Sequence, residues 1–344
     1  MIVESRDAAD LDDARDRRLL DVRGLTVEFQ TSRGWSRAVE DVSFDVRPGE
    51  TVGLVGESGS GKTVAMQSVL GLMKRANARV SGSAFFEGSD LLPMSERELC
   101  RIRGNRVGTI FQQPARSLNP AFKVGEQIAE TIRHHRNVSR KVAWRRAVEL
   151  LDQLSIPNAA RRAEEYPHTF SGGMCQRVMI AVALSCDPTL LIADEPTTAL
   201  DVTVQAAILD LLRDIQEARG IAIVLISHDL GIVSEMCERT FIMYAGQVVE
   251  VGPTGRLLSS PRHPYTEGLL RGLPENMLAG RLQSIPGNVP PLGRFPDGCH
   301  FEPRCEYASA GRCDASVPPL EIVDDRMVRC IRTSEVVLKG VDAR

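Results

Sequence analysis

A glycine-rich segment in the first quarter of the chain has the residue types and spacing of a phosphate-binding loop. It matches the pattern G-x-x-x-x-G-K-[ST] and consists of Gly56, Glu57, Ser58, Gly59, Ser60, Gly61, Lys62 and Thr63. Glycines let successive N–H groups turn toward phosphate oxygens, and the positive N-terminal end of a following helix adds to the attraction. We therefore expect this P-loop to bind ATP, with Lys62 on the β- and γ-phosphates and the Thr63 hydroxyl on Mg²⁺. A chance glycine-rich turn is the alternative.

An apolar run that ends in two acids, Asp194 and Glu195, lies downstream of this loop. Two acids at a strand end are often only a solvated terminus, but together with a P-loop they form a Walker B arrangement. We expect Asp194 to hold the Mg²⁺ shell and Glu195 to polarise the water that attacks the γ-phosphate. The pair predicts an enzyme that hydrolyses ATP.

The segment Phe170-Ser171-Gly172-Gly173-Met174 resembles the signature motif of the ABC ATPase family, in which Ser-Gly-Gly begins a helix. The resemblance implies that residues Ser171 to Met174 close over the γ-phosphate of an ATP bound to a partner subunit, and a helix N-terminus is suited to an anion. The usual leading Leu is Phe170 here and the usual final Gln is Met174, a change that occurs in the peptide-importer branch. A plain helix with Ser171 as its N-cap is the alternative.

The same resemblance assigns roles to further residues. Gln112 corresponds to the Q-loop residue that contacts Mg²⁺ and senses the transmembrane partner, and Asp201 to the D-loop at the dimer interface. His228 corresponds to the switch histidine, which contacts the γ-phosphate and steadies the catalytic glutamate; a structural histidine at a strand end is the alternative. Phe29 most resembles the aromatic residue that stacks on adenine, with Trp35 as its competitor and core packing as the alternative for both.

Four of the eight cysteines gather near the end of the chain: Cys299, Cys305, Cys313 and Cys330. Their spacing matches neither the tight knuckle of structural zinc sites nor the common ferredoxin patterns, so free thiols, zinc and an iron–sulfur cluster all stay open on spacing alone. An arginine directly precedes three of them, at Arg304, Arg312 and Arg329. We expect these cations to lower the pKa of the neighbouring thiols.

Four short segments resemble the dipeptide/oligopeptide importer ATPases, in particular their D-type subunit: FQQP at 111–114, SLNP at 117–120, RHPYT at 262–266 and GCHFEPRC at 298–305. This resemblance implies that the four cysteines hold one [4Fe–4S] cluster with a structural role, with Zn²⁺ as the alternative. It also implies a second, related ATPase subunit in a heterodimer, two transmembrane permease subunits and, indirectly, an extracytoplasmic substrate-binding protein. The expected cargo is di- or oligopeptides or a related small solute.

The motifs need an α/β framework to position them. Alternating apolar residues over 20–46 predict antiparallel strands, and apolar runs at 51–55, 190–194 and 221–226, separated by helical patterns, predict a buried parallel sheet. Residues 112 to about 165 are mostly helical in pattern. With the resemblance, these features predict a RecA-like P-loop ABC ATPase core with an antiparallel β subdomain and a helical subdomain.

The chain is expected to divide into a mobile N-terminus at 1–18, an ABC ATPase domain at 19–252, with its helical subdomain at about 112–165, and a C-terminal extension at 253–344. The extension is rich in cysteine, and eleven of the nineteen prolines follow residue 252. Few large apolar residues remain there, which favours an inorganic centre as its stabilising element.

Composition restricts the function further. The net charge of -3 does not favour nucleic-acid binding, and no apolar run approaches the ~20 residues that span a bilayer. We expect a peripheral protein on the cytoplasmic face of the cell membrane. A soluble ABC ATPase acting on DNA or ribosomes is the first alternative, although such proteins usually carry two ATPase units or a long coiled coil. A protein that binds ATP without hydrolysing it is the second, and the intact Glu195 and His228 oppose it.

Overall fold

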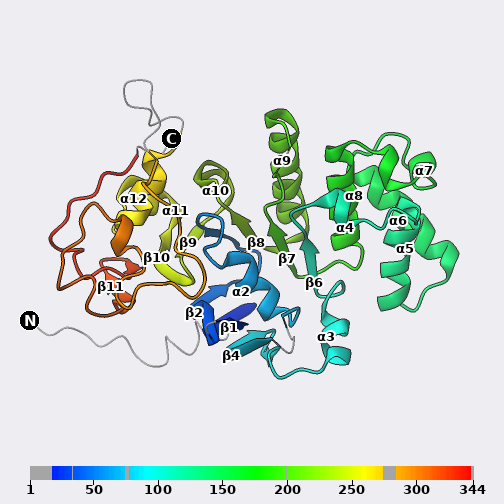
Figure 1. The fold of residues 1–344 in the computed structure, drawn as a ribbon. Helices are drawn as coiled ribbons and strands as arrows, with labels where there is room; N and C mark the ends of the chain where they lie inside the picture. Colours follow the sequence, from blue (N-terminus) through cyan, green and yellow to red (C-terminus); the bar gives the residue numbers. More distant parts are fainter. Residues whose placement is uncertain (1–17, 33, 74–76, 199, 274–283, 342–344) are drawn as a thin grey trace, which may run out of the picture.

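The structure is a computed structural model that describes residues 18–32, 34–73, 77–198, 200–273 and 284–341 (Figure 1). The expected mobile N-terminus lies outside these residues except for Arg18. In the described part of the chain, no helix is both long and apolar enough to cross a membrane.

A four-stranded antiparallel sheet lies below the centre of Figure 1 and has the strand order β2-β1-β4-β5. Its strands are β1 (Leu20–Thr31), β2 (Gly34–Val46), β4 (Ala78–Phe86) and β5 (Ser89–Asp90). The β1–β2 hairpin pairs Leu20 with Val46 at one end and Thr31 with Gly34 at the other, and its register shifts between Val22 and Glu28. The antiparallel strands predicted over 20–46 are confirmed.

The second sheet has eight strands in the order β11-β12-β10-β9-β3-β8-β7-β6. These strands are β3 (Thr51–Val55), β6 (Val107–Ile110), β7 (Leu190–Asp194), β8 (Ala222–Ser227), β9 (Arg239–Tyr244), β10 (Gln247–Pro253), β11 (Glu321–Val323) and β12 (Arg326–Val328). The pairs from β9 through β6 are parallel, whereas β10, β12 and β11 add to the edge in antiparallel fashion. The predicted parallel core is therefore confirmed, and the sheet continues into the C-terminal segment.

Both faces of the large sheet are buried, which is why its central strands are apolar throughout. On β8, Ile223 and Leu225 belong to a core shared with the helices, whereas Val224 and Ile226 belong to a core shared with the antiparallel sheet. The first core includes α8 (Gly172–Leu184), α9 (Val202–Arg219) and α10 (Leu230–Met236), and the second includes α2 (Lys62–Val69). The α/β fold class is confirmed.

The helical region lies at one end of the molecule, beyond β6 (Figure 1). Its elements are α4 (Pro114–Ser117), α5 (Val124–His135), α6 (Arg140–Gln153), α7 (Ala159–Arg162) and the 3₁₀ turn η1 (Pro167–Thr169), while α3 (Glu96–Ile102) precedes β6. Fully buried Ile128 on α5 and Leu150 on α6 join this region to the helix-side core.

The C-terminal segment lies at the opposite end of the molecule (Figure 1). It contains α11 (Thr254–Ser259), α12 (Pro264–Arg271), the 3₁₀ turn η3 (Glu302–Arg304), β11 and β12. Residue Glu250 on β10 is fully buried and accepts hydrogen bonds from the N–H groups of Arg262 and His263 and from the Thr266 hydroxyl. Arg326 of β12 also pairs with Glu250, at 3.3 Å. One carboxylate thus fastens the segment to the main sheet, and the domain boundary expected at 252 stays a prediction.

Candidate nucleotide-binding site

The P-loop turn connects β3 to α2, and two of its glycines are required by the close approach of other segments. A Cβ atom on Gly56 would lie 2.1 Å from the Met243 carbonyl oxygen. Gly61 has a φ of 99°, in the left-handed region, and a Cβ there would lie 2.9 Å from the Ala38 carbonyl oxygen. Larger residues at either position would force the loop away from the neighbouring backbone.

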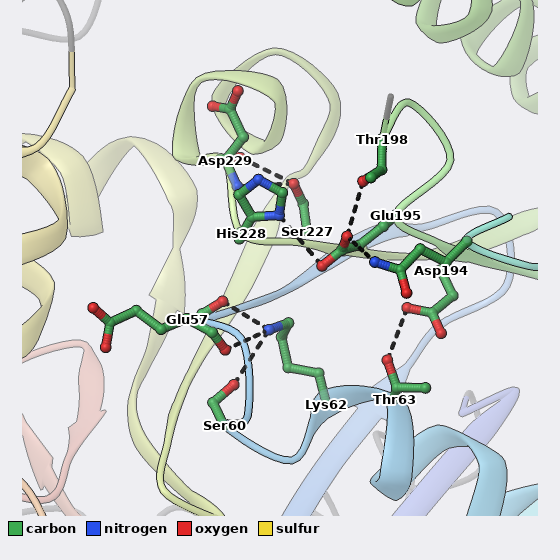
Figure 2. Close-up of polar contacts among 12 residues, drawn as sticks. Glu57, Ser60, Lys62, Thr63, Asp194, Glu195, Thr198, Ser227, His228 and Asp229 are labelled. Atoms are coloured by element: carbon green, nitrogen blue, oxygen red, sulfur yellow. Dashed lines mark hydrogen bonds and ion pairs between the residues drawn. The ribbon is translucent and has the colours of Figure 1, made fainter. Parts of the chain in front are cut away.

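The ammonium group of Lys62, the first residue of α2, lies inside the loop (Figure 2). Its Nζ donates to the carbonyl oxygens of Gly56 at 2.7 Å and Glu57 at 3.0 Å and to the Ser60 hydroxyl at 3.3 Å. Burial lowers the pKa of Lys62 to about 8, against the opposing effect of nearby carboxylates that include Glu195. These hydrogen bonds place Lys62 Nζ inside the loop that we expect to bind phosphate groups.

Two oxygen donors lie where the resemblance expects Mg²⁺. The Thr63 hydroxyl donates to Asp194 Oδ1 at 3.0 Å (Figure 2), and Asp194 ends β7 with only 7% of its surface exposed. Burial raises the pKa of Asp194, and the hydrogen bond from Thr63 opposes that rise. Mg²⁺ prefers a few protein oxygens completed by nucleotide oxygens and water. This pair fits that preference, although no three His, Cys, Asp or Glu side chains in the described residues are grouped to hold a metal ion.

The carboxylate of Glu195 is held by three side chains from three separate segments. It accepts from Gln112 Nε2 at 2.6 Å and from the Thr198 hydroxyl at 2.8 Å, and it lies 3.3 Å from His228 Nδ1 (Figure 2 shows the last two). Glu195 itself has a φ of 47°, in the left-handed region, which is uncommon for a residue other than glycine. One carboxylate therefore contacts three segments: the Q-loop segment, the turn that follows β7 and the end of β8.

The electrostatics of Glu195 suit a base that stays ionised. Burial favours its neutral form, but the hydrogen bonds from Thr198, His228 and Gln112 outweigh burial and leave the pKa of Glu195 below its usual value. Glu195 is largely covered, whereas the imidazole of His228 is exposed to 59%. An exposed imidazole beside a covered carboxylate leaves His228 accessible to a nucleotide.

The signature residues lie at the start of α8. Ser171 caps the helix, with its hydroxyl accepting from the Met174 N–H at 3.3 Å. Ser171 and Gly172 are exposed, and Gly173 and Met174 are half-buried. Asp201 plays a similar capping part for α9, accepting from the Val204 N–H at 2.9 Å. The capping alternative is thus observed, and it leaves the exposed face of the motif open.

The adenine candidates lie on the first hairpin. Phe29 is half-buried and packs against the core of the antiparallel sheet. The guanidinium of Arg79 lies 3.8 Å from the centre of the Trp35 ring, a cation–π contact that covers Trp35. Both contacts are within the protein and do not show where adenine would stack, so the role of Phe29 stays a prediction.

The four C-terminal cysteines line one pocket together with Phe301, Tyr307 and their neighbours. Backbone approach brings them together, because Cys299 N–H donates to the Cys313 carbonyl at 2.8 Å. Burial raises the pKa of Cys299 to about 11 and that of Cys305 to about 12. Within the described residues, these thiols do not form a group arranged around a single metal ion.

The expected lowering by a preceding arginine is wrong for Cys305 and Cys330, because burial raises the pKa of both thiols. Arg304 pairs with Glu57 at 2.5 Å, Arg312 pairs with Glu335 at 2.8 Å, and Arg329 donates to backbone carbonyl groups. Each of the three cations is thus engaged by an acceptor other than the cysteine that follows it.

Two family models match the chain: "ABC transporter" over residues 39–198 and "Oligopeptide/dipeptide transporter, C-terminal region" over residues 249–313. A Brucella abortus (strain 2308) protein named "Putative peptide import ATP-binding protein" is 49% identical over 324 residues, covering 93% of this chain and 97% of that protein. A protein of the same name from Brucella melitensis (strain 16M) is 48% identical over 332 residues, covering 92% and 98%. The chain belongs to the ABC transporter ATP-binding family, in its oligopeptide/dipeptide branch.

Solved structures agree with this ABC ATPase assignment. The ATP-binding cassette MJ0796, in a dimeric post-hydrolysis state bound to ADP and Pi, superimposes with a TM-score of 0.62 at 27% identity. The match covers 68% of this chain and 98% of that cassette. CbiO1 of Clostridium perfringens, part of the ABC transporter complex cbiONQ, gives a TM-score of 0.59 at 26% identity and covers 70% of this chain and 90% of that one. The alternative of an ATPase acting on DNA or ribosomes receives no support from these relatives.

Three residues that contact the ABC ATPase site were not predicted from the sequence. Thr198 holds Glu195, while Tyr265 and Arg304 from the C-terminal segment contact Glu57 of the P-loop. Thr198 lies three residues after Glu195, so its closeness in sequence to the Walker B acids was a signal for it. Tyr265 and Arg304 lie more than 200 positions from Glu57, and no local signal connects them to it.

Proposed function

We propose that this ABC ATPase powers uptake of di- or oligopeptides, or of a related small solute, by closing an ATP-sandwich dimer. ATP hydrolysis is supported by the convergence of Gln112, Thr198 and His228 on the Glu195 carboxylate. Glu195 follows β7, and β8 alone separates β7 from β3, the strand that leads into the P-loop. The peptide cargo is supported by the names of the relatives and by the C-terminal family match. Reconstitution with the permease subunits tests the cargo: a peptide-loaded binding protein should stimulate ATP hydrolysis, and stimulation only by a non-peptide solute would contradict it.

In this proposal, separate groups of residues bind the phosphates, hold Mg²⁺ and activate the attacking water. P-loop N–H groups and Lys62 bind the phosphates, and Thr63, Asp194 and Gln112 hold Mg²⁺, which would offset the charge of the phosphates. Glu195 accepts a proton from the attacking water, and His228 contacts the γ-phosphate and keeps Glu195 in place. The low pKa of Glu195 and its hydrogen-bond partners support a role for it as an oriented, ionised base.

A composite site between two chains is supported by where the signature lies. Figure 1 shows α8 well apart from α2 and the P-loop, so Ser171 to Met174 are not placed over the phosphate loop of their own chain. We propose that they close over ATP on a second, related ATPase subunit, with Asp201 at the shared interface. MJ0796 is dimeric in its solved structures, which supports such pairing. Whether the second subunit is a paralogue is tested by the masses of the co-purified chains.

Two permease subunits would connect this chain to the cytoplasmic face of the membrane, and an extracytoplasmic binding protein would act through them. An open groove in the proposed helical subdomain supports a docking place for a short permease helix. It is lined by Ala121, Phe122, Lys123, Glu126, Arg140, Lys141, Trp144, Glu164 and Tyr166, and Phe122 is exposed to 50%. Cysteines introduced along this groove should cross-link to the permeases. Cross-links formed solely from the proposed extension at 253–344 would contradict this docking.

We propose that Cys299, Cys305, Cys313 and Cys330 ligate one [4Fe–4S] cluster of structural role, with Zn²⁺ as the alternative. Four soft sulfur donors that line one pocket support such a group. Such a group would stabilise a proline-rich segment, and its binding would release the protons that burial keeps on the thiols.

Anaerobic purification with iron, sulfide and zinc assays tests the cluster. We expect about four irons per chain, lost in Cys305→Ser and kept in Cys100→Ser, whose exposed thiol lies outside the pocket. Stoichiometric zinc without iron would contradict the cluster and support the alternative.

A further inference from the structure

Glu57, the second residue of the P-loop, is held at both its amide and its carboxylate by the C-terminal segment. Its N–H donates to the Tyr265 hydroxyl at 2.8 Å. Its carboxylate accepts from both terminal nitrogens of Arg304, at 2.5 and 3.0 Å, a two-pronged geometry that fixes orientation as well as distance. In Figure 2 the Glu57 side chain points away from Lys62, so these contacts anchor the outer side of the loop.

The two anchoring side chains are themselves rigid. Tyr265 is fully buried, and its ring lies 4.6 Å from that of Tyr244 and 5.3 Å from that of Phe301. The Arg304 side chain is only 5% exposed and also donates to the Pro286 carbonyl at 2.8 Å. A P-loop held by such residues has little freedom to change shape independently of the C-terminal segment.

Arg304, which holds the Glu57 carboxylate, belongs to the same short segment as two of the pocket cysteines. Arg304 directly precedes Cys305, and Phe301 of the aromatic cluster follows Cys299 by two positions. Both cysteines line the four-cysteine pocket, and Phe301 lines it as well. A change in the conformation of residues 299–305 would therefore displace the guanidinium that holds Glu57.

We propose that Tyr265 and Arg304 are positioning residues that keep the P-loop in its nucleotide-binding shape, and that the state of the four-cysteine pocket sets ATP affinity through Arg304. This inference rests on the proposed binding of ATP by the P-loop. The physical link is the backbone of Gly56 and Glu57, because Lys62 donates to both of their carbonyl oxygens. The Gly56 carbonyl belongs to the same peptide unit as the Glu57 N–H that Tyr265 holds, and Arg304 holds the Glu57 side chain. Without the anchors, binding ATP must also order this turn, and that cost appears as weaker affinity.

The first test is the dissociation constant for MgATP of the purified full chain, measured by calorimetry. Arg304→Met should weaken binding about tenfold, within the usual range of coupling between sites, while the hydrolysis rate at saturating ATP in the assembled transporter stays unchanged. Tyr265→Phe should weaken binding in the same direction, and Arg304→Lys should restore part of the affinity. Arg312→Met is the matched control, because Arg312 also precedes a pocket cysteine but pairs with the exposed Glu335.

A double-mutant cycle separates the ion pair from general destabilisation. If Arg304 acts through Glu57, the combined Glu57→Gln and Arg304→Met variant should bind MgATP no more weakly than Arg304→Met alone. Additive losses, or an Arg304→Met affinity equal to that of the wild-type chain, would overturn the positioning role. A wild-type chain that binds no MgATP would instead contradict the proposed function itself.

The link to the cysteines has its own test. Cys305→Ser should weaken MgATP binding in the otherwise wild-type chain and add nothing in the Arg304→Met background. Equal effects of Cys305→Ser in both backgrounds would show that the pocket does not act through Arg304. Iron and zinc contents of the same samples report separately on what the pocket holds.

Discussion

Gln112 Nε2 donates a hydrogen bond of 2.6 Å to Glu195 Oε2 and thereby connects the segment that leads into the helical region with the carboxylate of the proposed base. Glu195 follows β7, whereas Gln112 lies two positions before the start of α4. A movement of the helical region, such as a permease would cause, therefore changes a contact of the proposed base. In the proposed function, this contact would couple movement of the permeases to hydrolysis.

Removal of this contact should slow hydrolysis. We expect Gln112→Ala to lower kcat roughly tenfold, because Glu195 loses one of the donors that orient it. MgATP binding should change less, since the P-loop supplies most phosphate contacts. Gln113→Ala is the control, because the Gln113 side chain makes no capping hydrogen bond to α4. Equal kcat values for the two variants in a phosphate-release assay would contradict the role of Gln112.

The affinity for MgATP should depend on pH through Lys62. Burial lowers the pKa of Lys62 to about 8, and bound phosphates would raise it again. Affinity should therefore be level well below about pH 8 and fall as the pH rises through that value, with proton uptake on binding. Calorimetry in buffers of different ionisation enthalpy measures the uptake. Lys62→Arg should abolish both effects, and a pH dependence unchanged in that variant would contradict the assignment.

The pair between Arg326 and Glu250 should dominate the attachment of the C-terminal segment. Both side chains are almost fully buried, at 1% and 0% exposed, so Arg326→Met leaves a buried carboxylate short of its charged partner. We expect a loss of about 3 kcal/mol in the free energy of unfolding, measured by denaturant titration. Arg213→Met, which removes an exposed pair with Asp210 on α9, should cost less than about 1 kcal/mol. Comparable losses in the two variants would contradict the burial argument.

The sequence predicted those parts of the site that depend on local pattern. Lys62 and Glu195 each lie at the junction of an apolar strand and a turn, and such junctions have short, recognisable signatures. The pairing of Arg304 with Glu57 joins residues that are 247 positions apart, and no periodicity or spacing encodes it. The pKa values of Cys305 and Cys330 were predicted in the wrong direction for the same reason. Sequence places Arg304 beside Cys305, but only the fold shows that its charge is directed to Glu57.

The strands at the edge of the large sheet could not be predicted from the sequence either. β11 and β12 have three residues each, too few to show alternation. They form because Arg326 reaches the buried Glu250 and because β12 pairs with β10. A long-range partner, rather than local propensity, makes these residues strands.

The central claim is that Glu195 is the base of an ABC ATPase that closes around ATP with a partner subunit. Glu195→Gln tests it most directly, in the purified transporter complex, by phosphate release and MgATP binding measured on the same samples. Phosphate release should fall by roughly a hundredfold or more, while MgATP stays bound and holds the ATPase dimer closed. Glu217→Gln, at an exposed position of α9, is the matched control and should hydrolyse ATP at the wild-type rate. Wild-type phosphate release by Glu195→Gln would contradict the account.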